Sequence, residues 1–332
     1  MNKKLIALVC GALISSNFLT TNVDAQSIKK DSSQRISINR NINQENNEDN
    51  PYVDEYTVDL TNLDLKIENG KIVAHHINSN YYLSSIVNEN QSKDLLNLSE
   101  VLKDKEYEKD LKNLILQNKK PIQISVSKVK VIEKLDENGE EISSRLMTVD
   151  EVNNIKNNGF IEAASQGTTQ RYNGLSLYTT VSGSGPDYWV QANAYWEHPG
   201  TSRGKDYIGI TWPSNFTKMN NDVCKISYTP RFEDRGGLYT VKPNAGAIWQ
   251  FRDAFGGGSE FYQAKGVYAG CSVKRTSGSK SYCSFTSKYV HATSKSSVSF
   301  SFTVGVKANA GTINVSREKI DWPLSSNVSG NF

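Results

Sequence analysis

Cysteine and histidine are scarce in this sequence, with four of each among 332 residues. It contains no His-Glu-x-x-His or Cys-x-x-Cys spacing, and it also lacks the phosphate-binding and serine-hydrolase motifs. His75 and His76 are adjacent, so on a strand they would point to opposite faces and could not share a metal ion. His198 falls in a predicted turn, and His291 follows a predicted strand. We therefore expect no metal site, no cofactor and no catalytic residue.

Long apolar runs and a strong charge of one sign are also missing. The net charge of +3 (38 Lys and Arg against 35 Asp and Glu) is too small for a protein that binds nucleic acid along its whole length. One apolar run, Leu5 to Ile14, follows Lys3 and Lys4 and precedes a polar stretch ending at Ala25, which is the order of a secretory signal. We expect cleavage after Ala25. The frequent Lys, Asn, Ile and Ser are typical of AT-rich bacterial genomes, so the sequence predicts a secreted, extracellular bacterial protein.

Charge and tryptophan content divide the rest of the chain into two parts. Residues 26–164 carry 18 Lys and Arg against 24 Asp and Glu, a net charge of −6, whereas residues 165–332 carry 18 against 10, a net charge of +8. All five tryptophans lie in the second part, and large aromatic rings supply much of the buried area of a core. The second part is therefore predicted to be the principal folded domain. The opposite charges suggest that the acidic part docks on it, although two independent domains would show the same composition.

The acidic part is expected to contain several units. After the signal peptide at residues 1–25, residues 26–51 have few apolar side chains and are predicted to be a disordered linker. Residues 52–160 have the pattern of a small acidic α+β region, which could be a pro-segment. Residues 161–170 are small and polar, as in an interdomain linker.

Local signals define the elements of the α+β region. Apolar alternation predicts one strand near Tyr56 and another that ends at the turn Asn138-Gly139. Between them, leucines at three- and four-residue steps predict one helical stretch capped by Ser92. Thr148 is followed three residues later by Glu151, the spacing of a capping box, so a second helix is expected to begin there and to end at Gly159.

Residues 171–332 consist of short alternating strands separated by turns with Gly or Pro, and they show no helical period. This pattern predicts a basic, aromatic-rich antiparallel β-sandwich. The expected fold class is therefore mainly β, a C-terminal antiparallel β-sandwich preceded by a small α+β N-terminal region. The clearest alternation runs from Val298 to Val306.

Three cysteines remain after removal of the signal peptide. Cys271 and Cys283 lie six residues either side of Ser277, at the centre of a turn-like segment, so a hairpin would place them opposite each other and allow a disulfide. A bridge to Cys224, or no bridge, is the alternative. Cys10 could be a lipidated cysteine, but the bulky residue before it disfavours this.

The predicted strand around residue 190 suggests a binding surface. Its apolar face is opposed by a face carrying Trp189, Gln191, Asn193 and Tyr195. If that second face is exposed, its aromatic rings could stack on sugars while the amides hydrogen-bond to hydroxyl groups. If the strand is central in a sheet, the same residues are buried.

The preferred functional interpretation is a non-catalytic extracellular binding or surface-interaction module. Its partner would be a cell-surface glycan or anionic polymer. One alternative is a membrane-acting, β-pore-forming toxin, because a strand such as Val298–Val306 has the length and alternation needed. Another is a secreted hydrolase, if two carboxylates among Asp206, Asp253 and Glu260 face each other. The ligand and the oligomeric state are left open by the sequence.

Overall fold

The computed structural model describes residues 8–9, 50–77, 89–158, 164–165, 168–230, 232–257, 260–293, 298–303, 305, 310–316 and 320–332. The predicted disordered linker, apart from residues 50 and 51, lies outside these residues, as do the predicted cleavage site and Gly159. Leu8 and Val9 of the predicted signal form a short strand, β1, on β4. In the described part of the chain, no helix is both long and apolar enough to cross a bilayer.

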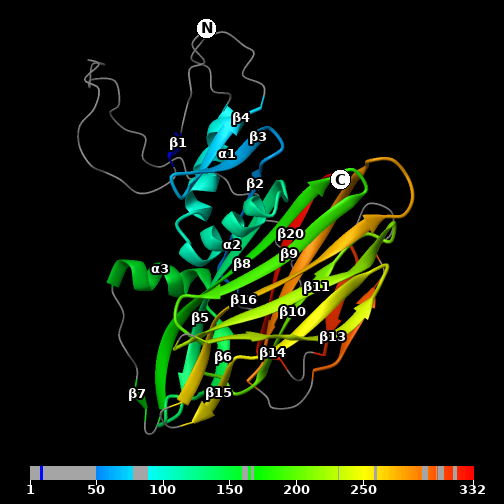
Figure 1. Cartoon of the computed structure of the whole chain (residues 1–332). Helices are drawn as coiled ribbons and strands as arrows, with labels where there is room; N and C mark the ends of the chain where they lie inside the picture. The colour runs from blue at the N-terminus through cyan, green and yellow to red at the C-terminus, as the bar shows by residue number, and fades with distance from the viewer. Residues whose placement is uncertain are drawn as a thin grey trace, which may run out of the picture.

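A large antiparallel sheet forms the centre of the molecule (Figure 1). Its main strands, in spatial order, are β12 (Phe232–Arg235), β11 (Phe216–Thr229), β16 (Glu260–Arg275), β9 (Asp187–Trp196), β8 (Thr168–Ser184), β5 (Pro121–Leu135) and β2 (Val53–Asp59). Three short strands pair at its margins: β15 (Ala254–Gly257) on β16, β6 (Glu141–Leu146) on β5 and β7 (Ala164–Ser165) on β8.

A second antiparallel sheet packs on one face of the large sheet. Its strands are, in spatial order, β13 (Gly237–Lys242), β14 (Gly246–Arg252), β10 (Lys205–Thr211), β17 (Tyr282–His291) and β20 (Trp322–Asn331). Apolar side chains of both sheets form the main core, among them Val190 and Ala192 of β9, Ile208 of β10 and Phe285 of β17. Since successive residues of a strand point to opposite faces, the alternating apolar positions of the sequence supply this core.

The outer face of each sheet is also covered. On the large sheet, α1 (Glu89–Val101), α2 (Lys105–Leu116) and the hairpin of β3 (Leu63–Glu68) and β4 (Lys71–His76) enclose a second core. On the small sheet, a hairpin of β18 (Phe300–Thr303) and β19 (Thr312–Val315) packs over Tyr207 and Ile248. A third helix, α3 (Val149–Asn158), follows β6. The prediction of a mainly β protein with an antiparallel sandwich and a small α+β region is confirmed.

The large sheet continues across the boundary predicted between the acidic and basic parts. β5, from the acidic part, pairs with β8 from Pro121 opposite Ser182 to Leu135 opposite Thr169. Ala164 and Ser165, in the predicted linker, pair with the first two residues of β8. Composition misses this continuity because a short hairpin of small polar residues has the composition of a linker. The β5 residues that pair with β8 lie 34 to 61 positions earlier in the sequence, from Leu135 opposite Thr169 to Pro121 opposite Ser182.

Two local predictions need correction. The single leucine-rich helix is two helices, and Ser92 lies within α1 rather than at a cap. Asp104 interrupts the stretch and caps α2, because its side chain accepts hydrogen bonds from the backbone of Glu106 and Tyr107. The strand expected over Val298–Val306 begins at Phe300 rather than Val298, as β18, and Val304 and Val306 lie outside the described residues. Its residues Phe300 and Phe302 pack against the outer core of the small sheet.

The capping box of α3 is confirmed and gives the first prediction. The amide of Glu151 donates to Thr148 Oγ1 at 3.2 Å, and the amide of Thr148 donates to Glu151 Oε2 at 2.9 Å. Thr148→Ala should lower the free energy of unfolding by about 1 kcal/mol, because one helix donor loses its partner. Asn153→Ala, on the exposed side of the same helix, should change it by no more than about 0.5 kcal/mol. Equal effects of the two variants in urea denaturation would contradict this assignment.

Candidate functional site

The outer face of β9 carries a continuous chain of hydrogen bonds. Trp189 Nε1 donates to Gln191 Oε1 at 3.1 Å, and Gln191 Nε2 donates to Asn193 Oδ1 at 3.1 Å. Asn193 Nδ2 donates to the Tyr195 hydroxyl at 3.1 Å and to Asp110 Oδ2 at 2.6 Å, and Tyr195 also donates to Asp110. The four residues named by the sequence are thus brought together on one face.

Glycines of the neighbouring strand β16 leave room for the two aromatic rings of this face. Gly266 lies opposite Tyr195 in the register, and a Cβ at Gly266 would meet the Tyr195 ring at 2.4 Å. A Cβ at Gly270 would meet the Trp189 ring at 2.8 Å. The rings therefore extend sideways over β16, each with an edge or face against its backbone.

Of the two alternatives that the sequence leaves open for this face, the structure shows the buried one. Gln191 and Asn193 are fully buried, and Trp189 and Tyr195 are each only 8% exposed. Segments of the acidic part cover these four residues, which we call the polar row. Asp110 of α2 accepts hydrogen bonds from Asn193 and Tyr195, and the Lys119 ammonium lies 3.3 Å from the centroid of the Trp189 ring. Burial lowers the pKa of Lys119. The contact between the acidic and basic parts that the charge split predicts is therefore present.

A cleft of about 330 Å³ remains beside α2, at the edge of the polar row. Its aromatic lining comes from Trp189, Tyr195 and Tyr268, and α2 contributes Asp110 and Asn113. β11 and β12 line the opposite side. Six charged side chains contribute, three acidic and three basic: Glu106, Asp110, Glu233, Lys109, Lys119 and Lys225. The cleft is thus aromatic and polar without an excess of either charge.

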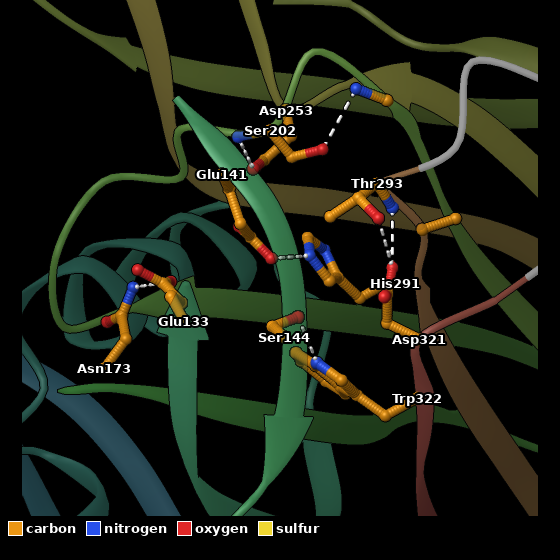
Figure 2. Close-up of polar contacts among 12 residues, drawn as sticks. Glu133, Glu141, Ser144, Asn173, Ser202, Asp253, His291, Thr293, Asp321 and Trp322 are labelled. Carbon is orange, nitrogen blue, oxygen red and sulfur yellow. Dashed lines mark hydrogen bonds and ion pairs between the residues drawn. The ribbon is translucent and has the colours of Figure 1, made fainter. Parts of the chain in front are cut away.

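A second polar cluster is buried between the two sheets (Figure 2). His291, the last residue of β17, places Nδ1 3.0 Å from Asp206 Oδ2 and Nε2 2.8 Å from Glu141 Oε1. The side chains of all three residues are inaccessible to solvent. Trp322 stacks on the His291 ring at a centroid distance of 5.1 Å. The imidazole is therefore held in one orientation.

Asp253 completes this cluster. It lies between β14 and β15, and its carboxylate packs against Gly200, where a Cβ would approach both oxygens to 2.1 Å. The amide of Ser202 donates to Asp253 Oδ2 at 3.3 Å (Figure 2). Asp253 Oδ1 is buried and has no hydrogen-bond partner among the described residues. Ligand atoms of Asp206, Asp253 and His291 lie within 4.8 Å of one another, so these residues could hold a metal ion.

The electrostatics of the cluster follow from burial and from charge pairing. Burial by itself lowers the pKa of His291, but Asp206 and Glu141 outweigh it and raise that pKa well above the usual value. Burial and then the neighbouring Asp206 raise the pKa of Asp253 well above its usual value. Without another cation, the protonated imidazole would be the charge that holds Asp206 and Glu141 together.

The sequence points to Asp206 and Asp253 as candidate catalytic carboxylates but does not show their arrangement. Asp206 and Asp253 are close, as the hydrolase interpretation requires, but both are 0% exposed, so a polymeric substrate could not reach them. The side chain of Glu260 lies outside the described residues. The sequence gives His291 no partner, because nothing in it shows that β10, β17 and β6 meet at one end of the sandwich.

The predicted disulfide between Cys271 and Cys283 is wrong. Both residues are free thiols, as is Cys224, and all three are buried. Cys271 lies on β16 opposite Val190 of the large sheet, whereas Cys283 lies on β17 opposite Gly330 of the small sheet. The turn near Ser277 therefore connects the two sheets and does not close a hairpin.

Comparison with known proteins adds little. No protein-family model matches the chain, and no curated protein matches its sequence. Among solved structures, the crystal structure of the collagen adhesin CNA from S. aureus is similar at 9% identity and a TM-score of 0.24. The match covers 63% of this chain and 91% of that chain. A likeness at this level supports no argument about function.

Asp110, the α2 residue that accepts hydrogen bonds from the polar row, gives a pH-dependent prediction. Burial raises the pKa of Asp110, and the hydrogen bonds from Tyr195 and Asn193 oppose this only in part. Asp110→Asn keeps an oxygen that can accept both bonds and removes the buried charge. It should unfold at higher denaturant concentration than the wild type at pH 7. The difference should shrink as the pH falls toward 3.8, because the wild-type carboxyl then becomes protonated in the folded state before the unfolded state. A difference that is constant with pH would refute the role of the charge.

The thiols give a second prediction from the site. Burial raises the pKa of both Cys224 and Cys271 to about 12. In the folded protein, Cys224, Cys271 and Cys283 should resist alkylation at neutral pH, because the thiolate is the reactive form. After denaturation without reductant, all three should be alkylated. A disulfide-linked peptide pair in a mass-spectrometric map would contradict the structure.

Proposed function

We propose that the protein is an extracellular binding module and that the cleft beside α2 binds a neutral glycan. The observation that carries the proposal is the composition of this cleft. Trp189, Tyr195 and Tyr268 supply aromatic surface, and Asp110 and Asn113 supply polar atoms beside it. Sugars combine apolar C–H faces with hydroxyl groups, so this pairing of rings and hydrogen-bonding groups suits them.

The charge of the cleft favours a neutral ligand over an anionic polymer. Its three acidic and three basic side chains cancel, although the basic part of the chain carries a net charge of +8. A site for an anionic polymer would need an excess of lysine or arginine where the ligand lies. The volume of about 330 Å³ is at the lower end of the range for ligand sites and suits one or two sugar rings.

The polar row beneath the cleft has a supporting role in this proposal. Gln191 and Asn193 are fully buried and hydrogen-bonded to their neighbours, so they hold Trp189 and Tyr195 in place. Ligand contact is assigned to the rims of those rings and to Tyr268, which is half-buried. The proposal also places the protein outside the cell, on the support of the predicted signal at residues 1–25.

Tyr268 allows a test with a matched control. Tyr268→Ala should weaken retention on chitin or cellulose, both neutral polysaccharides, about tenfold, because a lost stacking contact is worth roughly 1.4 kcal/mol. Tyr262→Ala changes another half-buried tyrosine of β16, which packs with Phe232 and Phe255 away from the cleft. It should retain the wild-type affinity. The melting temperature of each variant shows whether it remains folded.

Three outcomes would contradict this assignment. Equal loss of retention in both tyrosine variants would indicate a general loss of structure. Retention on heparin beads in preference to the neutral polymers would favour the anionic-polymer alternative. Dye release from loaded liposomes without retention on any polymer would favour the membrane-acting alternative.

A further inference from the structure

The buried cluster around His291 is distinct from the cleft and has features that the fold alone does not explain. Asp206 comes from β10, His291 from β17, Asp253 from the segment after β14, and Glu141 from β6. β10, β14 and β17 belong to the small sheet, whereas β6 pairs with β5 of the large sheet. Four separate segments thus converge on one solvent-free point between the sheets.

Carboxylates outnumber cations at this point. Glu133, also buried, lies beside the cluster and pairs with Arg171. The cluster and this pair together contain four carboxylates, those of Glu133, Glu141, Asp206 and Asp253, against one guanidinium and one imidazole. Buried charges are stable only when they are paired or bound to a metal. A divalent ion in place of the imidazole proton would halve the net charge of this group, from −2 to −1.

Two carboxylate oxygens show where positive charge is missing. Asp253 Oδ1 and Glu141 Oε2 are both buried, and no group in the described part of the chain hydrogen-bonds to either oxygen. Asp253 belongs to the group whose ligand atoms lie within 4.8 Å of one another, together with Asp206 and His291. An unpaired carboxylate oxygen that is fully buried beside a histidine and a second aspartate is the arrangement that a cation would complete.

We propose that Asp206, Asp253 and His291 bind a divalent metal ion, best matched by zinc. In this assignment the ion takes the place of the proton between His291 Nδ1 and Asp206, with Asp253 as the third ligand. Glu141 accepts a hydrogen bond from Nε2 and so directs the Nδ1 lone pair toward the ion, as carboxylates do behind metal-bound histidines.

The donor set and the burial distinguish zinc from the common hard cations. One imidazole nitrogen and two carboxylates suit zinc, which accepts three protein ligands and a fourth position. Calcium requires six to eight oxygen ligands, and magnesium keeps several of its waters, for which a site without solvent contact has little room. All three ligands belong to strands of the small sheet or directly follow one, so the ion would fasten this end of the small sheet. Because the ligands are closed to solvent, the ion would serve stability rather than catalysis.

The test uses the full chain without a histidine tag. Chelator-treated protein should bind about one zinc ion per chain, measured by elemental analysis after gel filtration, and its melting temperature should rise when zinc is added. Cobalt should give the visible absorption of a four-coordinate ion with nitrogen and oxygen ligands. Asp253→Asn should lose at least tenfold in zinc affinity and show no rise in melting temperature.

Asp321→Asn is the matched control, because Asp321 lies at the same end of the sandwich but accepts its hydrogen bonds from Thr293 (Figure 2). It should bind zinc as the wild type does. Wild-type protein that binds neither zinc nor cobalt would overturn the proposal, as would stronger binding of calcium than of zinc. If Asp253→Asn still binds one zinc ion per chain with the wild-type affinity, the ion lies elsewhere and the proposal is wrong. If Asp253→Asn does not fold, the cobalt spectrum of the wild type decides.

Discussion

The pairing of β5 with β8 is the constraint on which the rest of the structure depends. It joins residues 121–135, from the acidic part of the chain, to the sheet that the basic part forms. β2 and β6 in turn pair with β5, so both gain their place in the sheet through this strand. Removal of the acidic part as a pro-segment would therefore expose the edge of β8 and open two cores. The acidic part completes the fold and does not merely mask a finished domain.

Both candidate sites combine residues from the two parts of the chain. In the cleft, α2 supplies Asp110 while β9 and β16 supply the aromatic rings. In the buried cluster, Glu141 of β6 faces His291 of β17. The chain from β5 leads back to α2 through only four residues, 117–120, so the position of β5 also fixes where α2 lies over the sheet. The position of one strand thus determines the surroundings of both sites.

Period-two alternation was enough to predict the sandwich from the sequence, because the inner face of strands such as β9 is uniformly apolar. The capping box at Thr148 and the turn at Gly139 were also visible, since each depends on residues close in sequence. The burial of Trp189 and Tyr195 was not visible in the sequence, because the same alternation occurs whether the polar face of a strand contacts water or a helix. The false disulfide had a similar cause: the symmetry about Ser277 describes the loop but not the sheets to which its ends belong. The contact of His291 with Glu141 spans 150 residues and leaves no local signal.

The central claim is that the acidic and basic parts form one folding unit, with both sites built across their junction. Differential scanning calorimetry of the chain tests it most directly, because separate domains unfold in separate transitions. The structure predicts a single transition in which the calorimetric and van't Hoff enthalpies agree. Two transitions, with the acidic part unfolding while the basic part stays folded, would contradict it.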